Sequence, residues 1–208
     1  MIWCSDWPLA AAVSNAGGLG VIGSGGMYPD ELEENLKACT KATQMPFAVN
    51  LPLLYPDIEQ HVQHIINYKV PIVITSAGNP RTWTKKLQSQ GIKVIHVVSS
   101  VRFALKAEAA GVDAIVAEGF EAGGHNGREE TTTFVLTPAV ADAVGIPVIS
   151  AGGIRCGRGM LAAMALGASG VQIGSRFVLS EESSAHMNFK QAICNATEGD
   201  TELRLKAV

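Results

Sequence analysis

Short apolar runs alternate along this chain with longer stretches in which apolar residues recur at helical spacing. Each run is bounded by glycine, proline or small polar residues, which is typical of buried strands, and the stretches between them have the three-to-four-residue period of amphipathic helices. The predicted strands begin near Leu19, Phe47, Ile72, Lys93, Val112, Val148 and Gly170. Strict alternation of strands and helices predicts a parallel sheet.

Two architectures fit this alternation, an open doubly wound sheet and a (β/α)₈ barrel that lacks one unit. The last two predicted strands favour the barrel, because each ends in a small-residue loop, 151–153 and 174–175. A pair of such loops after strands seven and eight forms the phosphate site of a TIM barrel. We therefore predict an α/β fold of the TIM (β/α)₈ type, in one domain over residues 1–208, without its first strand.

Composition and charge indicate which kinds of partner the chain is expected to bind. The chain is 47% hydrophobic and 17% charged, with a formal net charge of −3 and no basic stripe. We expect no nucleic-acid partner and no membrane partner, since no apolar run approaches the roughly 18 residues of a membrane span. Small molecules and further copies of the chain, as in a homodimer, are the expected partners. The four cysteines are too widely spaced for a metal site and predict free thiols in a reducing cytoplasm.

Two motifs resemble known functional motifs, but the predicted elements around them do not support those functions. The stretch 18–23 has the glycine spacing of a dinucleotide-binding fingerprint, but it follows a predicted helix and contains a strand, whereas that fingerprint follows a strand and opens a helix. His61 and His64 lie three residues apart on one predicted helix, where a metal pair could form. With no third ligand in view, we interpret them as part of a solvated helix face, and no metal is expected.

The stretch 117–127 is the first candidate for catalysis. It follows a buried strand, holds four glycines in the nine residues from Gly119 to Gly127, and contains His125. Glycine-rich loops at the carboxyl ends of parallel strands are where such folds place their chemistry. We therefore take His125 as the candidate catalytic residue. The alternative is a flexible connection that carries a solvated histidine.

Other loops at strand ends indicate a bound ligand, and all of them should open on the same rim. Backbone N–H groups in the two terminal loops, together with the amino end of the helix predicted over 157–166, suit a phosphate monoester. Asn50 and Glu118 stand at strand ends, where they can hydrogen-bond a flat heterocycle, and Gly123 lets a ring lie against the backbone. The residues assigned to the phosphate are Gly152, Gly153, Gly174 and Ser175.

Four segments, in order and at matching spacing, carry a resemblance to a known family. They are Ser-Asn-Ala-Gly-Gly-Leu-Gly at 14–20, Glu-Gly-Phe-Glu-Ala-Gly-Gly-His at 118–125, Ala-Gly-Gly-Ile at 151–154 and Gly-Ser-Arg-Phe at 174–177. Over essentially its whole length the chain resembles the FMN-dependent family that unites nitronate monooxygenases, formerly 2-nitropropane dioxygenases, with the flavin-type enoyl-[acyl-carrier-protein] reductase II.

The resemblance implies an FMN at the barrel mouth. Its phosphate would lie on the 152–153 and 174–175 loops, Asn50, Glu118 and Gly123 would lie near the flavin, and His125 would face the reactive side. Family members begin with a strand that ends in Gln-Gly-Gly-Met or Gln-Gly-Pro-Met, and this chain starts at the methionine of that turn. We therefore expect the first strand and the C-terminal helical segment of the family to be missing.

Two chemistries compete within the family. One is oxidation of an alkyl nitronate with oxygen. The other is reduction of an enoyl thioester, often linked to acyl carrier protein, with NAD(P)H as the reductant. Where the resemblance places lysine and aspartate in bacterial monooxygenases, this chain has Val97 and Glu118, which are reductase-like choices. We favour the reductase, with the monooxygenase and a non-catalytic FMN-binding module as alternatives.

Overall fold

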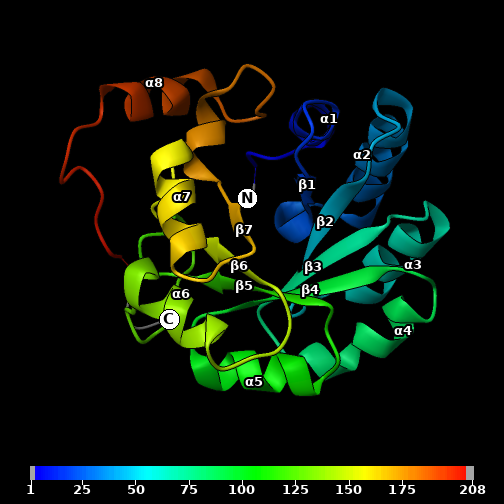
Figure 1. Ribbon diagram of the computed structural model, residues 1–208. Helices are drawn as coiled ribbons and strands as arrows, with labels where there is room; N and C mark the ends of the chain where they lie inside the picture. The colour runs from blue at the N-terminus through cyan, green and yellow to red at the C-terminus, as the bar shows by residue number, and fades with distance from the viewer. Residues whose placement is uncertain (1–2, 205–208) are drawn as a thin grey trace.

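The computed structural model describes residues 3–204 and contains one parallel sheet of seven strands. Each strand pairs with its neighbours in sequence, so the order in the sheet is β1 to β7. Figure 1 shows the sheet curving, with helices α1 to α7 around its outer side. The strands are β1 (Gly20–Gly23), β2 (Phe47–Pro52), β3 (Ile72–Ser76), β4 (Lys93–Val98), β5 (Ala114–Glu118), β6 (Val148–Ala151) and β7 (Gly170–Gln172).

This arrangement confirms the predicted TIM-type architecture and the count of seven strands. Within the described residues the sheet does not close, because β1 and β7 are its two edges. The helices are α1 (Trp7–Asn15), α2 (Pro29–Ala42), α3 (Ile58–Asn67), α4 (Thr84–Gln88), α5 (Val101–Ala109), α6 (Thr133–Ala141), α7 (Gly157–Ala165) and α8 (Met187–Asn195), with short 3₁₀ helices η1 (Ser24–Gly26), η2 (Pro80–Thr82) and η3 (Ser175–Leu179). The hydrophobic pattern gave no prediction of α8.

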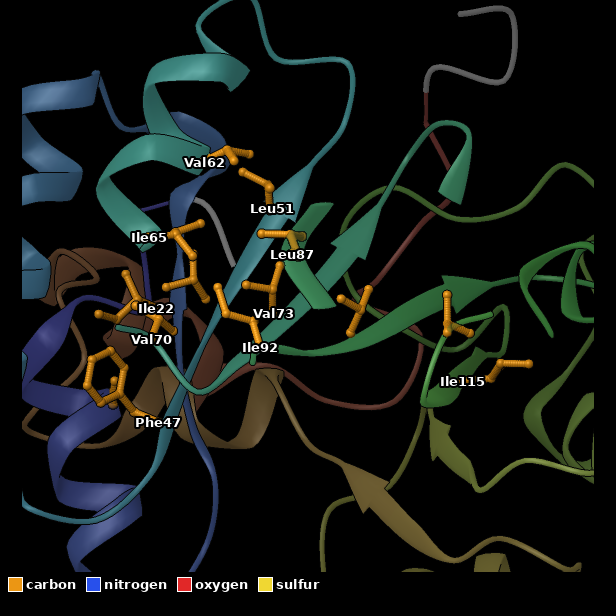
Figure 2. Close-up of a cluster of buried hydrophobic side chains, with 14 of the residues drawn as sticks. Ile22, Phe47, Leu51, Val62, Ile65, Val70, Val73, Leu87, Ile92 and Ile115 are labelled. Atoms are coloured by element: carbon orange, nitrogen blue, oxygen red, sulfur yellow. The ribbon is translucent and has the colours of Figure 1, made fainter. Parts of the chain in front are cut away.

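The strands are apolar on both faces because each face is covered. In β2, Phe47, Val49 and Leu51 pack with the large cluster between the sheet and the helices, and part of that cluster is drawn in Figure 2. Ala48, one residue out of phase, belongs to a smaller cluster on the other face. Side chains alternate between the two faces of a strand, so continuous apolar runs are expected in such a sheet. By the same alternation Asn50 lies on the same face as Ala48, and it is near the carboxyl end of β2.

One strand boundary differs from the prediction for a clear reason. We predicted a strand from Val112, whereas β5 begins at Ala114. Gly111 adopts a left-handed φ of +83°, and the Val112 N–H donates to the Ala107 carbonyl at 3.4 Å. This contact closes the end of α5, so Val112 belongs to the helix terminus although its apolar side chain looks like the start of a strand.

The prediction of a solvated histidine face on α3 is wrong for His61. This side chain is fully buried and stacks on Tyr55 with ring centroids 4.7 Å apart. Its position four residues before Ile65 places it on the core face of the helix, and burial lowers its pKa. In the described part of the chain no group of three or more His, Cys, Asp or Glu side chains is placed to hold a metal ion. Nor is any described helix long and apolar enough to cross a membrane.

Candidate active site

A large cavity lies at the carboxyl ends of the strands. Its volume is about 1260 Å³, and its lining comes from residues at or after the ends of β1, β2, β3, β4, β5 and β7. Parallel strands present their carboxyl ends at one edge, so loops distant in sequence meet there. Of the residues predicted to form the site, the cavity brings together Asn50, Glu118, Gly123 and His125.

Asn50 is held in one orientation by the neighbouring strand. Its Nδ2 donates to the Ile74 carbonyl at 3.0 Å and to Ser76 Oγ at 3.3 Å. Because a carbonyl can only accept, the amide nitrogen must face Ile74 and the oxygen must lie on the other side. No described residue donates to Oδ1. Asn50 therefore offers a fixed hydrogen-bond acceptor to the cavity.

Glu118 ends β5 and lines the same cavity, where it accepts no hydrogen bond from any described residue. Burial raises the pKa of its carboxyl group. A partly buried carboxyl group without a protein partner is costly, and a hydrogen-bond donor on a bound ligand removes that cost. Gln172, at the end of β7, also lines the cavity and was not predicted as a site residue. Together these side chains suit the polar edge of a heterocycle.

The loop that carries His125 is braced by hydrogen bonds, which argues against a merely flexible connection. Asn126 Nδ2 donates to the Ala122 carbonyl at 2.8 Å, and the Phe120 N–H donates to the Thr131 carbonyl at 2.8 Å. At the base of the loop, Glu121 accepts hydrogen bonds from the backbone and the hydroxyl of Thr133. His125 itself is exposed and lines the cavity. The loop thus holds an accessible imidazole on an anchored backbone.

The four residues assigned to a phosphate lie beside this cavity and do not line it. Gly152 is needed for packing, because a Cβ there would lie 2.6 Å from Thr133 Oγ1. Gly174 faces open space, with no atom within 4 Å of the position of a Cβ. Ser175 approaches the loop that carries His125, since a Cβ on Gly123 would be 2.9 Å from its Oγ. Open space at Gly174 is compatible with a ligand group, and the phosphate assignment stays a prediction.

His96 is a lining residue that the sequence reasoning missed. It lies in β4, is buried, and its Nδ1 is 2.7 Å from Thr75 Oγ1, which is 3.1 Å from the Ile95 carbonyl. Both contacts are satisfied when the hydroxyl donates to the carbonyl and accepts from Nδ1–H, which leaves Nε2 as an acceptor. Burial lowers the pKa of His96 to about 4, so the ring is neutral at neutral pH. The sequence feature that could have identified His96 as a site residue is the presence of a histidine inside an apolar strand run.

Comparisons with known proteins agree on one family. The family model described as nitronate monooxygenase matches residues 1–61 and 55–207. A probable nitronate monooxygenase of Staphylococcus saprophyticus is 37% identical over 238 aligned residues, covering 93% of this chain and 67% of that protein. The structure of FabK from Thermotoga maritima superposes with a TM-score of 0.91 at 50% identity, covering 95% of this chain and 63% of that one.

A third relative carries a different activity in its name. It is (3aS,4S,5R,7aS)-5-hydroxy-7a-methyl-1-oxo-octahydro-1H-indene-4-carboxyl-CoA dehydrogenase of Rhodococcus jostii, 38% identical over 184 residues, covering 88% of this chain and 52% of that protein. The chain spans between half and about two thirds of the length of these relatives. The matching family model, the identities and the shared fold agree with the four sequence segments, and the chain belongs to the nitronate monooxygenase family.

Proposed function

We propose that this protein is an FMN-dependent oxidoreductase that reduces the double bond of an enoyl thioester with NAD(P)H. The observation that carries the proposal is one cavity that holds a fixed amide acceptor, a carboxyl group that accepts no hydrogen bond from the described residues, and an accessible histidine. Its volume of about 1260 Å³ exceeds the roughly 300–1,000 Å³ of pockets for one drug-sized ligand. A flavin and a second ligand can therefore share it.

The residues present fit FMN. Asn50 Oδ1 and the Glu118 carboxyl group are acceptor sites to which no residue among 3–204 donates, and the pyrimidine part of an isoalloxazine ring presents both donors and acceptors. Gly174 and Ser175, near the amino end of η3, would hold the phosphate together with Gly152 and Gly153. When bound, FMN supplies the hydride chemistry that no side chain can supply. The protein would then have to hold the FMN, orient the substrate and supply a proton to it.

His125 is the proposed proton donor. Reduction of an enoyl thioester places hydride on the β-carbon and requires a proton at the α-carbon. Imidazole is the side chain best suited to exchanging protons near neutral pH, and His125 is exposed to the cavity on a braced loop. The hydrogen bonds of Asn126 fix the backbone next to it, so the imidazole can approach a bound substrate without the loop having to order first.

Similarity favours the reductase among the family's activities. The 50% identity to FabK, the flavin-type enoyl-[acyl-carrier-protein] reductase, is higher than the 37% identity to the staphylococcal relative. The Rhodococcus relative, whose name specifies a carboxyl-CoA substrate, also supports a thioester. Val97 lines the cavity where the resemblance places lysine in bacterial monooxygenases. The second candidate is nitronate oxidation, favoured by the family model and by the name of the staphylococcal relative.

Anaerobic flavin reduction separates the candidates. Purified protein should be yellow, NADH or NADPH should bleach it, and crotonyl-CoA should restore the colour. A matched sample receives propyl-2-nitronate instead of the nicotinamide. Bleaching by nitronate and indifference to NAD(P)H would assign the monooxygenase. A flavin that neither reagent reduces would leave only FMN binding and would contradict both enzymatic proposals.

A further inference from the structure

Two cationic side chains and one aromatic side chain gather on one side of the cavity. Arg81 comes from η2, which follows β3, while Phe103 and Lys106 come from α5, which follows β4, and all three line the cavity. The elements η2 and α5 are in contact with each other. We call these three residues the basic lip. They come from helical elements, whereas Asn50 and Glu118 come from the strands themselves.

The backbone beneath the basic lip is fixed. The Arg81 N–H donates to Asn79 Oδ1 at 3.1 Å, which caps η2, and Thr84 Oγ1 donates to the carbonyl of the buried Pro80 at 2.6 Å. On α5, Lys106 Nζ lies 5.7 Å from the centre of the Phe103 ring, one helical turn away. A preorganised position reduces the entropy lost when a ligand binds.

Neither cation of the lip forms an ion pair with a carboxylate of residues 3–204. The ion pairs among the described residues involve His64, Lys93 and Arg204, so Arg81 and Lys106 have no such partner there. Among the described residues that line the cavity, Glu118, at the end of β5, is the one acid. In a chain whose net charge is −3, this local excess of positive charge is open to an anion. Guanidinium and ammonium groups together are a usual phosphate-binding pair.

We propose that the basic lip binds the phosphate groups of a phosphopantetheine-type thioester, while Phe103 packs against an apolar part of the same ligand. This inference rests on the proposed function, because it names the carrier of the enoyl group. An alkyl nitronate carries no phosphate and would leave both cations without a partner. The dinucleotide NAD(P)H also carries phosphates, so the test must separate these two sources of the same anion.

The test compares Arg81→Gln/Lys106→Gln with a control, Lys85→Gln/Arg102→Gln. The control removes two exposed cations from α4 and α5 that do not line the cavity. Calorimetry on the FMN-loaded full chain measures binding of coenzyme A, of pantetheine, which lacks the phosphates, and of NADH and NADPH. We expect the lip variant to bind coenzyme A about tenfold more weakly, the combined contribution of two exposed charge pairs. Its pantetheine affinity and the control's affinities for all ligands should not change.

The outcomes are distinct. Unchanged coenzyme A affinity in the lip variant, or an equal loss for pantetheine, would overturn the proposal. A loss confined to NADH and NADPH would show that the lip binds phosphate but would overturn its assignment to the thioester. Because binding is measured without turnover, the result stands apart from the proposed reductase activity. That activity fails separately if crotonyl-CoA binds through the lip but does not reoxidise the flavin.

Discussion

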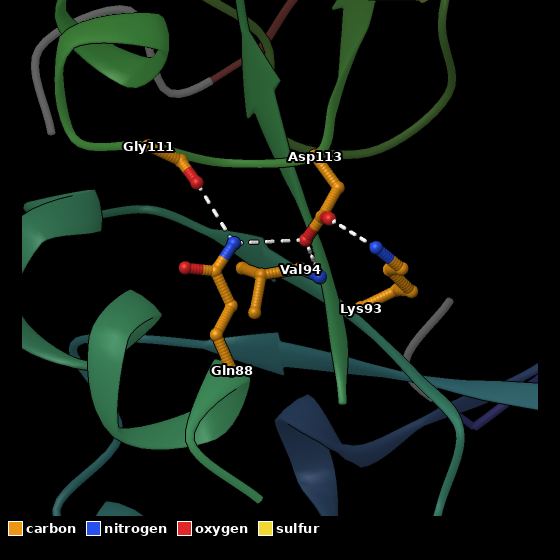
Figure 3. A network of polar contacts seen from close by, with 5 residues as sticks. All are labelled: Gln88, Lys93, Val94, Gly111 and Asp113. Atoms are coloured by element: carbon orange, nitrogen blue, oxygen red, sulfur yellow. Dashed lines mark hydrogen bonds and ion pairs between the residues drawn. The ribbon is translucent and has the colours of Figure 1, made fainter. Parts of the chain in front are cut away.

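Replacing Asp113 with alanine should destabilise the protein by removing a junction between β4 and the start of β5. Figure 3 shows the contacts: Asp113 Oδ2 accepts hydrogen bonds from the Val94 N–H and from Gln88 Nε2, each at 2.9 Å. Asp113 Oδ1 accepts from Lys93 Nζ at 2.8 Å. The Asp113 N–H in turn donates to the Val94 carbonyl at 2.7 Å. One carboxylate thus ties α4, β4 and the segment before β5 together at the end of the sheet opposite the cavity.

The loss of unfolding free energy can be estimated from the contacts that the substitution removes. The Lys93 side chain is 70% exposed, so its ion pair contributes about 0–1 kcal/mol to the free energy of unfolding. A partly buried N–H that loses its acceptor costs about 1–3 kcal/mol, and Val94 is fully buried. We expect Asp113→Ala to lower the free energy of unfolding by about 1–4 kcal/mol. Lys93→Gln, the matched control, should lower it by less than about 1 kcal/mol.

Urea unfolding followed by circular dichroism tests this at neutral pH and again at falling pH. Burial alone raises the pKa of Asp113, but the hydrogen bonds from Lys93, Val94 and Gln88 and the Lys93 charge outweigh it and lower the pKa. A carboxyl group with a lowered folded-state pKa stabilises the fold above its unfolded pKa of about 3.9, and this contribution disappears as pH falls through the folded value. The stability difference between wild type and Asp113→Asn should therefore shrink below about pH 4. Equal costs for Lys93→Gln and Asp113→Ala would refute the dominant role of the backbone hydrogen bond.

Three further predictions concern the site and the edge of the sheet. His125→Ala should keep its FMN absorbance and lose roughly 10²–10⁴-fold in thioester turnover, the usual contribution of one positioned acid or base; a variant that lost flavin yet turned over with excess FMN would make His125 a cofactor ligand. Gly174→Val should cost most of the FMN affinity by filling open space at the proposed phosphate site, and purified variant with full flavin occupancy would contradict this. Gly20→Ala should cost about 3 kcal/mol in urea unfolding, because the new Cβ would lie 1.8 Å from the Ala10 carbonyl oxygen, whereas Gly170→Ala, with open space around it, should cost far less.

Strands β1 to β6 were predictable because their apolar runs are largely buried, which gives a signal that does not depend on partners, whereas β7 has no buried residue. The ends of helices and the burial of single polar residues were harder to predict from the sequence. Val112 is apolar and adjoins a strand, but a hydrogen bond to α5 assigns it to the helix end. His61 looked solvated because it is polar, although its spacing from Ile65 places it on the core face. A local hydrogen bond at the end of α5 decides the first position and burial in the core decides the second, and in both residue type alone points the wrong way.

The candidate site also contains residues that the sequence predicted and residues that it did not. Asn50, Glu118 and His125 stand at or just after strand ends, and the topology of a parallel sheet brings such positions to one rim whatever the details of packing. His96 lies within an apolar strand run, where polarity was its only signal, and Arg81 and Lys106 reach the cavity because of how η2 and α5 pack. The strand-end positions are those proposed to hold flavin and exchange protons, functions that both candidate chemistries need. The helix-borne positions are those proposed to recognise the carrier of the substrate. On these two proposals, an enzyme that oxidises nitronates would need the first set but would have no phosphate for the second set to bind.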